Sequence, residues 1–320
     1  MTTDTNTKNL SFGAQICRLF VGNRSWNAPE SHLPDGKQTS RYLVAAMIAG
    51  LACLAFAAKF IGMQIVVNAT IAFAAASLVE LIFAMVRKQE AKGGALTFAV
   101  LLALLLPVSA PIWTIAVTAV FGTIFGKEVF GGAGDYLFNP VVIAVLFFYQ
   151  GYASLAGHDL VTFSSIVKLG DTTFDLNSPT YIGASLVTVA GMIACIVARP
   201  KSIVIFLVII FSALIVAYGL ATYSCLNVEL FKTPINLLLA NGFLFIVCFL
   251  ACDPSTVPTR FPAVVAYGLI IGAGTMLLTN YSDEGTQTII PLAVILLANM
   301  FGAMFEVMFT PSTSTPAGEN

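Results

Sequence analysis

Three acidic residues lie inside or at the end of strongly apolar stretches: Glu80 in SLVELIFAMVRKQE, Asp253 in ACDPSTVP and Glu306 in NMFGAMFEVMF. A carboxylate in a hydrocarbon environment is costly, so such acids are rare and usually belong to a path for ions or protons. We therefore expect all three to serve an ion pathway. A structural interpretation also stays open for each. Glu80 is followed by Arg87 towards the interface, Glu306 lies near a helix end, and an Asp-Pro pair favours a turn.

Other groups of residues that often carry chemistry give weaker signals. Cys248 and Cys252 are four residues apart, on one face of an expected helix, but no further metal ligands lie near them in the sequence. Both histidines lie in polar segments, so we expect no metal site. A polar stretch at residues 126–140, GKEVFGGAGDYLFNP, separates two apolar runs. Its glycines lack the strand–helix context of a dinucleotide-binding fold.

The composition indicates an integral membrane protein. Hydrophobic residues make up 58% of the chain and charged residues only 10%, against about 25% charged in soluble domains. A bilayer core of about 30 Å needs about 20 residues per helix. The apolar runs are 42–61, 64–86, 94–107, 110–126, 138–152, 181–198, 202–220, 236–252, 262–279 and 288–309. We therefore predict an all-α integral membrane protein with ten transmembrane helices.

Charge placement supports this count. With a cytoplasmic N-terminus and ten crossings, only Lys59, Lys168 and Lys232 of the 15 Lys and Arg residues would lie outside. Such an excess of positive charge on one side is typical of cytoplasmic loops. The sequence thus predicts a cytoplasmic segment at 1–41, a transmembrane domain at 42–310, and a disordered cytoplasmic tail at 311–320.

Two proline pairs indicate an internal repeat. Pro107 and Pro111 flank the end of one short apolar run, and Pro254 and Pro258 follow another at the same spacing. An apolar run, a polar Gly-containing loop and a second apolar run come after each pair. Five helices per half would make the halves inverted, and we expect the third and eighth helices to be broken around a central pathway. The simpler interpretation is that each pair ends a helix in a turn.

Several stretches, taken in order, resemble the NqrB/RnfD family, whose members are membrane subunits of ion-translocating NADH:quinone and ferredoxin:NAD oxidoreductases. GKEVFGGAGDYLFNP is similar to the family's KEVFGG-x-G-x-x-x-x-NP signature. ACDPSTVP resembles A-T-D-P-V-x-x-P, with Cys252 where Thr is usual, and YSDEG resembles a Y-P-E-G segment. The resemblance covers about residues 40–309 and implies the family's ten-helix fold.

The resemblance also implies a flavin site. Family members carry FMN joined by a phosphoester to a Thr in an outer D-x-x-[ST]-G-A-T loop. The matching stretch here, DLVTFSS, keeps Asp159 and Thr162, but Phe163 replaces the Gly and Ser165 stands at the acceptor position. A hydroxyl survives, so the resemblance leaves covalent FMN at Ser165 chemically feasible, whereas Phe163 would obstruct the attaching enzyme.

Further expectations follow from the same resemblance. Gly131 and Gly132 would let backbone approach a central flavin or quinone closely, with riboflavin or quinone as further cofactors. Glu80, Asp253 and Glu306 would take up cations. The chain would work in the bacterial inner membrane beside other membrane and peripheral subunits of a redox complex. It would not be catalytic alone and would bind no nucleic acid.

Three functions therefore compete. The leading one is a subunit of an ion-translocating electron-transport complex that passes electrons through flavin. The altered acceptor loop favours a second, a flavin-less relative that transports an ion or small solute. The third is a scaffold subunit with no transported species. Flavin fluorescence of the protein on a denaturing gel separates the first from the others.

Overall fold

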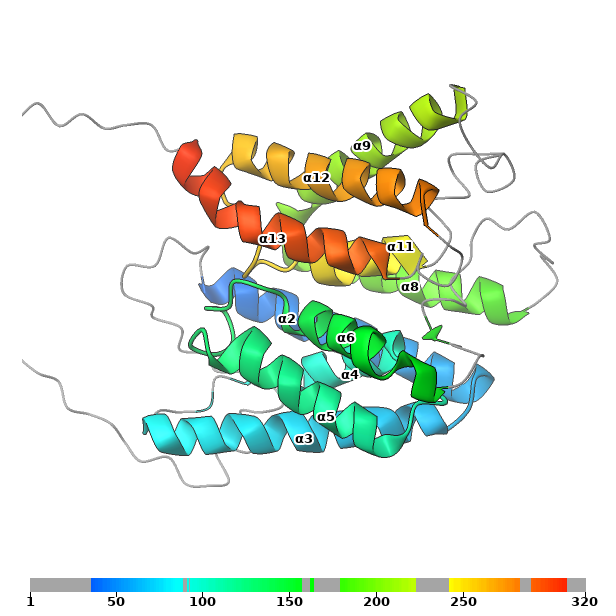
Figure 1. Ribbon diagram of the computed structural model, residues 1–320, viewed down its shortest axis with the longest axis vertical. Helices are drawn as coiled ribbons and strands as arrows, with labels where there is room; N and C mark the ends of the chain where they lie inside the picture. Colours follow the sequence, from blue (N-terminus) through cyan, green and yellow to red (C-terminus); the bar gives the residue numbers. More distant parts are fainter. Residues whose placement is uncertain are drawn as a thin grey trace, which may run out of the picture.

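The structure, a computed structural model, describes residues 36–88, 91, 93–156, 162–163, 179–222, 242–282 and 289–309. Within these ranges all regular secondary structure is helical. Most of the helices extend in roughly the same direction, and those of residues 36–151 lie in one part of the molecule and those of residues 179–308 in the other (Figure 1). This arrangement confirms the predicted all-helical fold for the described residues.

The helices follow the apolar runs of the sequence. The first group contains α2 (Gly36–Phe60), α3 (Gln64–Arg87), α4 (Ala95–Leu105), α5 (Ile112–Thr123) with a π-helical turn η1 (Ile124–Glu128), α6 (Pro140–Gly151) and the short η2 (Ala153–Ala156). The second contains α8 (Pro179–Ala198), α9 (Ser202–Thr222), α11 (Phe243–Ile246) with a π-helical continuation η4 (Val247–Ala251), α12 (Phe261–Asn280) and α13 (Ile290–Met308). Each of the expected apolar runs therefore contains a helix.

Length and composition make five helical stretches candidates for crossing a membrane: Arg41–Phe60, Gln64–Arg87, Ser202–Leu220, Phe261–Asn280 and Ile290–Met308. Shorter apolar helices are Ala95–Leu105, Pro140–Gly151 and Leu186–Ala198. The chain is thus a multi-pass membrane protein. Ten crossings and inverted halves stay predictions.

The first helix begins earlier than its apolar run. Polar residues of α2 precede residue 42, so the expected boundary between an N-terminal segment and the membrane domain falls inside a helix. Hydropathy marks the part of a helix suited to lipid, and it carries no information about how far the backbone hydrogen bonds continue beyond that part.

Both proline pairs lie in turns. Pro107 and Pro111 lie between α4 and α5, and Pro254 and Pro258 lie between η4 and α12. The backbone therefore agrees with the simpler interpretation, in which each proline pair ends a helix in a turn. The helix that ends before the first pair has only 11 residues, about 16 Å at 1.5 Å per residue, which is too short to span a bilayer.

The two short helices lie deep in the molecule. All residues of α4 except Leu96 are buried, as are all residues of η4. A helix that is apolar on every side is suited to such a position. The sequence therefore places half-length helices in the core and the longer ones around them.

Small residues bring α9 and α12 into close contact. Gly268 and Gly272 lie one turn apart on α12. The Ser212 hydroxyl of α9 lies 3.2 Å from the Gly268 carbonyl oxygen and 2.9 Å from the Ile209 carbonyl oxygen, so it can donate its hydrogen to either. A Cβ added at Gly272 would overlap the Ser212 hydroxyl and the Ile209 carbonyl. Such small-residue spacing lets the backbones of membrane helices approach closely.

Candidate functional site

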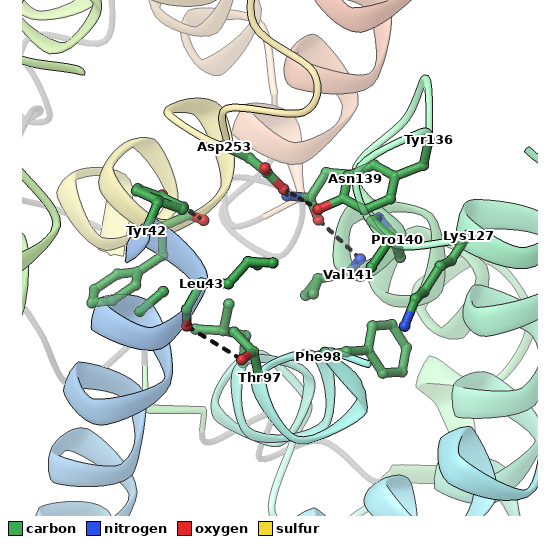
Figure 2. A pocket seen from close by; sticks show the side chains of 15 residues that line it. Tyr42, Leu43, Thr97, Phe98, Lys127, Tyr136, Asn139, Pro140, Val141 and Asp253 are labelled. Atoms are coloured by element: carbon green, nitrogen blue, oxygen red, sulfur yellow. Dashed lines mark hydrogen bonds between the residues drawn. The ribbon is translucent and has the colours of Figure 1, made fainter. Parts of the chain in front are cut away.

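A small cavity lies where the ends of several helices converge. It is lined by residues of α2, of the start of α4, of η1, of the loop before α6, of the start of α6 and of η4, and by Asp253 beyond η4. Figure 2 shows Tyr42 at one edge of this cavity and Lys127 at the opposite edge. Its volume for the centres of water molecules is about 40 Å³, which is room for about three waters. Convergent ends of short helices are typical of ion sites in transporters.

Asp253 lies on this cavity and is only 4% exposed. Its carboxylate accepts hydrogen bonds from the Tyr136 hydroxyl at 2.8 Å, the Asn139 amide at 3.1 Å and the Ser255 backbone N–H at 3.0 Å. Tyr136 and Asn139 belong to the stretch at 126–140, so the two most characteristic sequence motifs meet here (Figure 2). All three donors are neutral.

Asn139 explains why the glycine-rich stretch ends in Asn-Pro. Its side-chain oxygen accepts a hydrogen bond from the Val141 N–H at 3.0 Å and so caps α6, with Pro140 in the first turn. Its amide donates to Asp253 and, at 3.4 Å, to the Leu250 carbonyl. The positive end of α6 therefore lies near Asp253, where it favours the ionised carboxylate.

Glu80 forms a buried ion pair with Lys127. The Lys127 ammonium contacts a carboxylate oxygen of Glu80 and donates to the Gly93 carbonyl at 2.6 Å. Both side chains are almost completely buried. The second carboxylate oxygen of Glu80 has no hydrogen-bond partner within the described part of the chain.

The π-helical turn η1 carries Lys127 to this position. The Val129 N–H bonds to the Ile124 carbonyl at 2.9 Å, five residues back. One extra residue in a turn rotates the following side chains relative to an α-helix, and such turns are frequent at functional sites. Counting charges alone placed Lys127 in a cytoplasmic loop, whereas the structure buries it.

Arg87 pairs with Glu128 rather than with Glu80. A guanidinium nitrogen lies 3.4 Å from a Glu128 carboxylate oxygen, and another donates to the Glu128 carbonyl. The guanidinium also lies 5.1 Å from the centre of the Phe83 ring. The adjacent residues of the KEVFGG motif thus bind two different partners on α3, which motif matching does not reveal.

Gly131 and Gly132 form the turn that follows η1. Their φ angles are +120° and +104°, a region that residues with a side chain rarely adopt. The Gly131 N–H donates to the Glu128 carbonyl at 3.1 Å and the Gly132 N–H to the Lys127 carbonyl at 3.0 Å. These contacts show how the glycines reverse the chain towards Tyr136, and their cofactor role stays a prediction.

Glu306 lies on α13 and contacts the start of α12, but it is not among the lining residues of the cavity. Its carboxylate accepts from the backbone N–H groups of Thr259 and Arg260 at 3.0 and 3.3 Å, and from the Thr259 hydroxyl. A guanidinium nitrogen of Arg260 lies 3.8 Å away. These contacts cap α12 from α13, and an ion-pathway role for Glu306 stays a prediction.

The described part of the acceptor-like loop consists of Thr162 and Phe163. Thr162 is buried, and Phe163 is fully buried with its ring 5.8 Å from that of Phe245 in an edge-to-face contact. The residue that stands at the family's Gly position therefore packs into the core beside α11. Asp159 and Ser165 lie outside the described residues.

The cysteines within the described ranges, Cys53, Cys195, Cys248 and Cys252, are buried free thiols. In the same part of the chain, no three His, Cys, Asp or Glu side chains are close enough to hold a metal ion. Cys248 and Cys252 belong to the hydrophobic core. Packing in this core therefore accounts for their spacing.

Comparison with known proteins gives consistent matches. The model of the NQR2, RnfD, RnfE family matches residues 27–315. Relatives named as a subunit of the Na(+)-translocating NADH-quinone reductase include those of Chromohalobacter salexigens (26% identity, covering 75% of this chain and 64% of the relative) and Pseudoalteromonas atlantica (28%, 73% and 63%). That of Klebsiella pneumoniae is 27% identical, covering 72% and 62%. The chain spans less than two thirds of the length of these relatives. Because the family model covers most of its length, the chain belongs to the NQR2, RnfD, RnfE family.

Proposed function

We propose that this chain is a membrane subunit of an ion-translocating oxidoreductase of the NADH:quinone or ferredoxin:NAD type, and that it couples electron transfer to cation movement. It acts with other membrane and peripheral subunits in the bacterial inner membrane, with both termini cytoplasmic, and is not catalytic alone. Support comes from membership of the family, from relatives named as subunits of a sodium-translocating reductase, and from buried acids between membrane helices.

The environment of Asp253 is the observation that carries this proposal. Among the described residues, no Lys or Arg nitrogen lies within ion-pair distance of its carboxylate, which accepts hydrogen bonds from neutral donors. The buried guanidinium of Arg199 interacts with it electrostatically from beyond that distance. An ionised group in a low-dielectric interior is stabilised most by a charge in direct contact with it. A mobile cation that enters the adjoining cavity supplies that contact, so Asp253 is the cation-binding acid. In this proposal Glu80 and Glu306 are further acids of the ion pathway.

Flavin supplies the electron chemistry in this proposal, and the chain positions it. FMN would be esterified to Ser165, with Asp159 and Thr162 in the same stretch of sequence, and riboflavin or quinone would bind near Gly131 and Gly132. The cavity beside Asp253, at about 40 Å³, is far smaller than the roughly 300 Å³ of small-molecule pockets. It fits ions and water, so the rings of a flavin or quinone belong outside it.

Asp253→Asn tests the cation role in membrane vesicles that contain the whole complex. We expect the sodium concentration for half-maximal quinone reduction to rise at least about tenfold, equivalent to about 1.4 kcal/mol of lost binding, with uptake of radioactive sodium reduced in parallel. Asp135→Asn, at an exposed acid in the loop that carries Tyr136, is the control and should behave as the wild type. Unchanged sodium dependence in Asp253→Asn contradicts the role of Asp253.

A flavin-less transporter is the alternative, and the burial of Phe163 favours it because the chain beside the acceptor position is held in the core. A denaturing gel of the purified chain decides between the two. A fluorescent band that disappears in Ser165→Ala supports attached flavin. A dark wild-type band, together with no flavin in an acid extract of the native protein, supports the alternative.

A further inference from the structure

Arg199, in the connection between α8 and α9, carries a buried positive charge without an anion in contact. The residue is only 2% exposed, and its Nε and Nη1 atoms have no hydrogen-bond partner in the described part of the chain. Asp253 interacts with the guanidinium electrostatically, but within the same ranges no carboxylate oxygen lies at ion-pair distance from it. Buried charged donors without partners are rare, because they lose their contacts with water. The guanidinium therefore needs an acceptor that these residues do not supply.

A further donor without a partner lies in the same turn. Ser202, the first residue of α9, is 1% exposed, and its hydroxyl has no hydrogen-bond partner among the described residues. The Ser202 N–H donates to the Arg199 carbonyl at 2.9 Å, and a turn closed in this way keeps its two end Cα atoms within about 7 Å of each other. The free donors therefore belong to one short turn, at the positive end of a 21-residue helix.

The surface beside this turn is suited to the boundary of a membrane. Val197 near the end of α8, and Ile203 and Leu207 near the start of α9, are exposed apolar side chains. Lys201, in the turn itself, is exposed as well. Basic residues beside the lipid-facing part of membrane helices lie at the level of the lipid headgroups, where they attract anionic lipids. The anion that is most abundant at this level is the phosphate of a phospholipid.

We propose that the turn between α8 and α9 binds a phosphate group, with Arg199 and Ser202 as its donors and Lys201 at its entrance. Phosphate has several acceptor oxygens, and arginine binds it with strong, charge-assisted hydrogen bonds. Its negative charge compensates the buried guanidinium. A phospholipid offers this group with its acyl chains against the exposed side of α9, and free phosphate offers the same chemistry. Neither donor residue lines the cavity at Asp253, so the inference does not depend on the proposed function.

Lipid binding to the purified, delipidated full-length chain in detergent tests the site. Native mass spectrometry measures the affinity for phosphatidylglycerol, and diacylglycerol with the same acyl chains is the probe without phosphate. In Arg199→Gln we expect the affinity for phosphatidylglycerol to fall at least about tenfold, the loss expected for one hydrogen bond to a charged group. Lys88→Gln removes the same charge from an exposed position just after α3. This matched control should bind phosphatidylglycerol as the wild type does.

Radioactive inorganic phosphate distinguishes the two sources of the phosphate group. Phosphate that binds to the delipidated chain through Arg199 shows a site open to the free ion. Binding of phosphatidylglycerol that depends on Arg199 and is not displaced by inorganic phosphate shows a lipid site. Either result supports the proposal. Binding of neither probe, or binding that Arg199→Gln and Lys88→Gln weaken equally, overturns it.

Two further measurements cover the case in which Arg199→Gln fails to fold. Ser202→Ala is a milder change and should weaken binding of the phosphate-bearing probe severalfold, because one donor is lost. In the wild type, that probe should raise the midpoint temperature of unfolding, because a ligand that binds only the folded state stabilises it. Diacylglycerol should leave the midpoint unchanged. Equal stabilisation by phosphatidylglycerol, inorganic phosphate and diacylglycerol overturns the proposal, as does unchanged affinity in Ser202→Ala.

Discussion

Glu80 and Asp253 are both buried carboxylates served by the same stretch of chain, residues 126–140, yet their charges are compensated differently. Glu80 contacts the ammonium of Lys127, whereas Asp253 accepts hydrogen bonds from Tyr136, Asn139 and a backbone N–H. A fixed cation closes the first site. Neutral donors orient the second carboxylate, and in the proposed function a mobile cation binds to it. Burial of an acid alone therefore does not identify a cation site. The groups that already contact the carboxylate determine whether it can bind a mobile cation.

The largest loss of stability should come from breaking the ion pair between Glu80 and Lys127. Glu80→Gln leaves the Lys127 ammonium buried without its counter-charge, so we expect the free energy of unfolding in detergent to fall by about 3–5 kcal/mol. Removal of both charges in Glu80→Gln with Lys127→Met should cost much less than the sum of the two single changes, since residues in contact are not additive. Additive costs would show that the two side chains do not form a pair.

An intermediate loss of stability is expected when a hydrogen bond to Asp253 is removed. Tyr136→Phe removes one of three hydrogen bonds to the Asp253 carboxylate, and a bond to a charged group contributes about 1.5–3 kcal/mol. The same unfolding measurement checks this value. Tyr281→Phe is the control, because that side chain is mostly exposed and surface changes usually stay within about 0.5 kcal/mol. Equal losses in the two variants would contradict the hydrogen bond to Asp253.

The smallest effect belongs to the third acid. Glu306→Gln should lower the free energy of unfolding by only about 1 kcal/mol, since its contacts are a helix cap and an ion pair with Arg260, whose side chain is 41% exposed. Unfolding at low and high salt checks this interpretation. The ion-pair part of the loss should shrink in high salt. A loss as large as that of Glu80→Gln would place Glu306 with the buried acids.

Hydropathy and proline placement predicted much of the architecture. They indicated the helical class, the positions of the apolar helices and the short helices that end before Pro107 and Pro254. These features are local, because a run of apolar residues and a missing backbone donor act on their own segment. The start of α2 was missed, since polar residues continue a helix without changing its hydropathy signal.

The contacts at the acids were beyond reach of the sequence. Lys127 lies 47 positions from Glu80, and Tyr136 lies 117 positions from Asp253. Arg87, two turns beyond Glu80 on the same helix, was the nearer partner in sequence, but it binds Glu128. Such pairs depend on how helices pack. The type of residue does indicate that such a pair exists. Lys127 lies in a polar stretch between apolar runs, and a buried lysine needs an acidic partner.

The contact between Gly272, Ser212 and the Ile209 carbonyl has a consequence for motion. The two backbones are so near that even a methyl group would collide, and packed interfaces of this kind are not continuously deformable. In the proposed function, helices α9 and α12 would therefore move together as one rigid unit. Hinges are to be sought at the proline turns and at the π-helical segments, and a disulfide crosslink between these two helices should leave turnover intact.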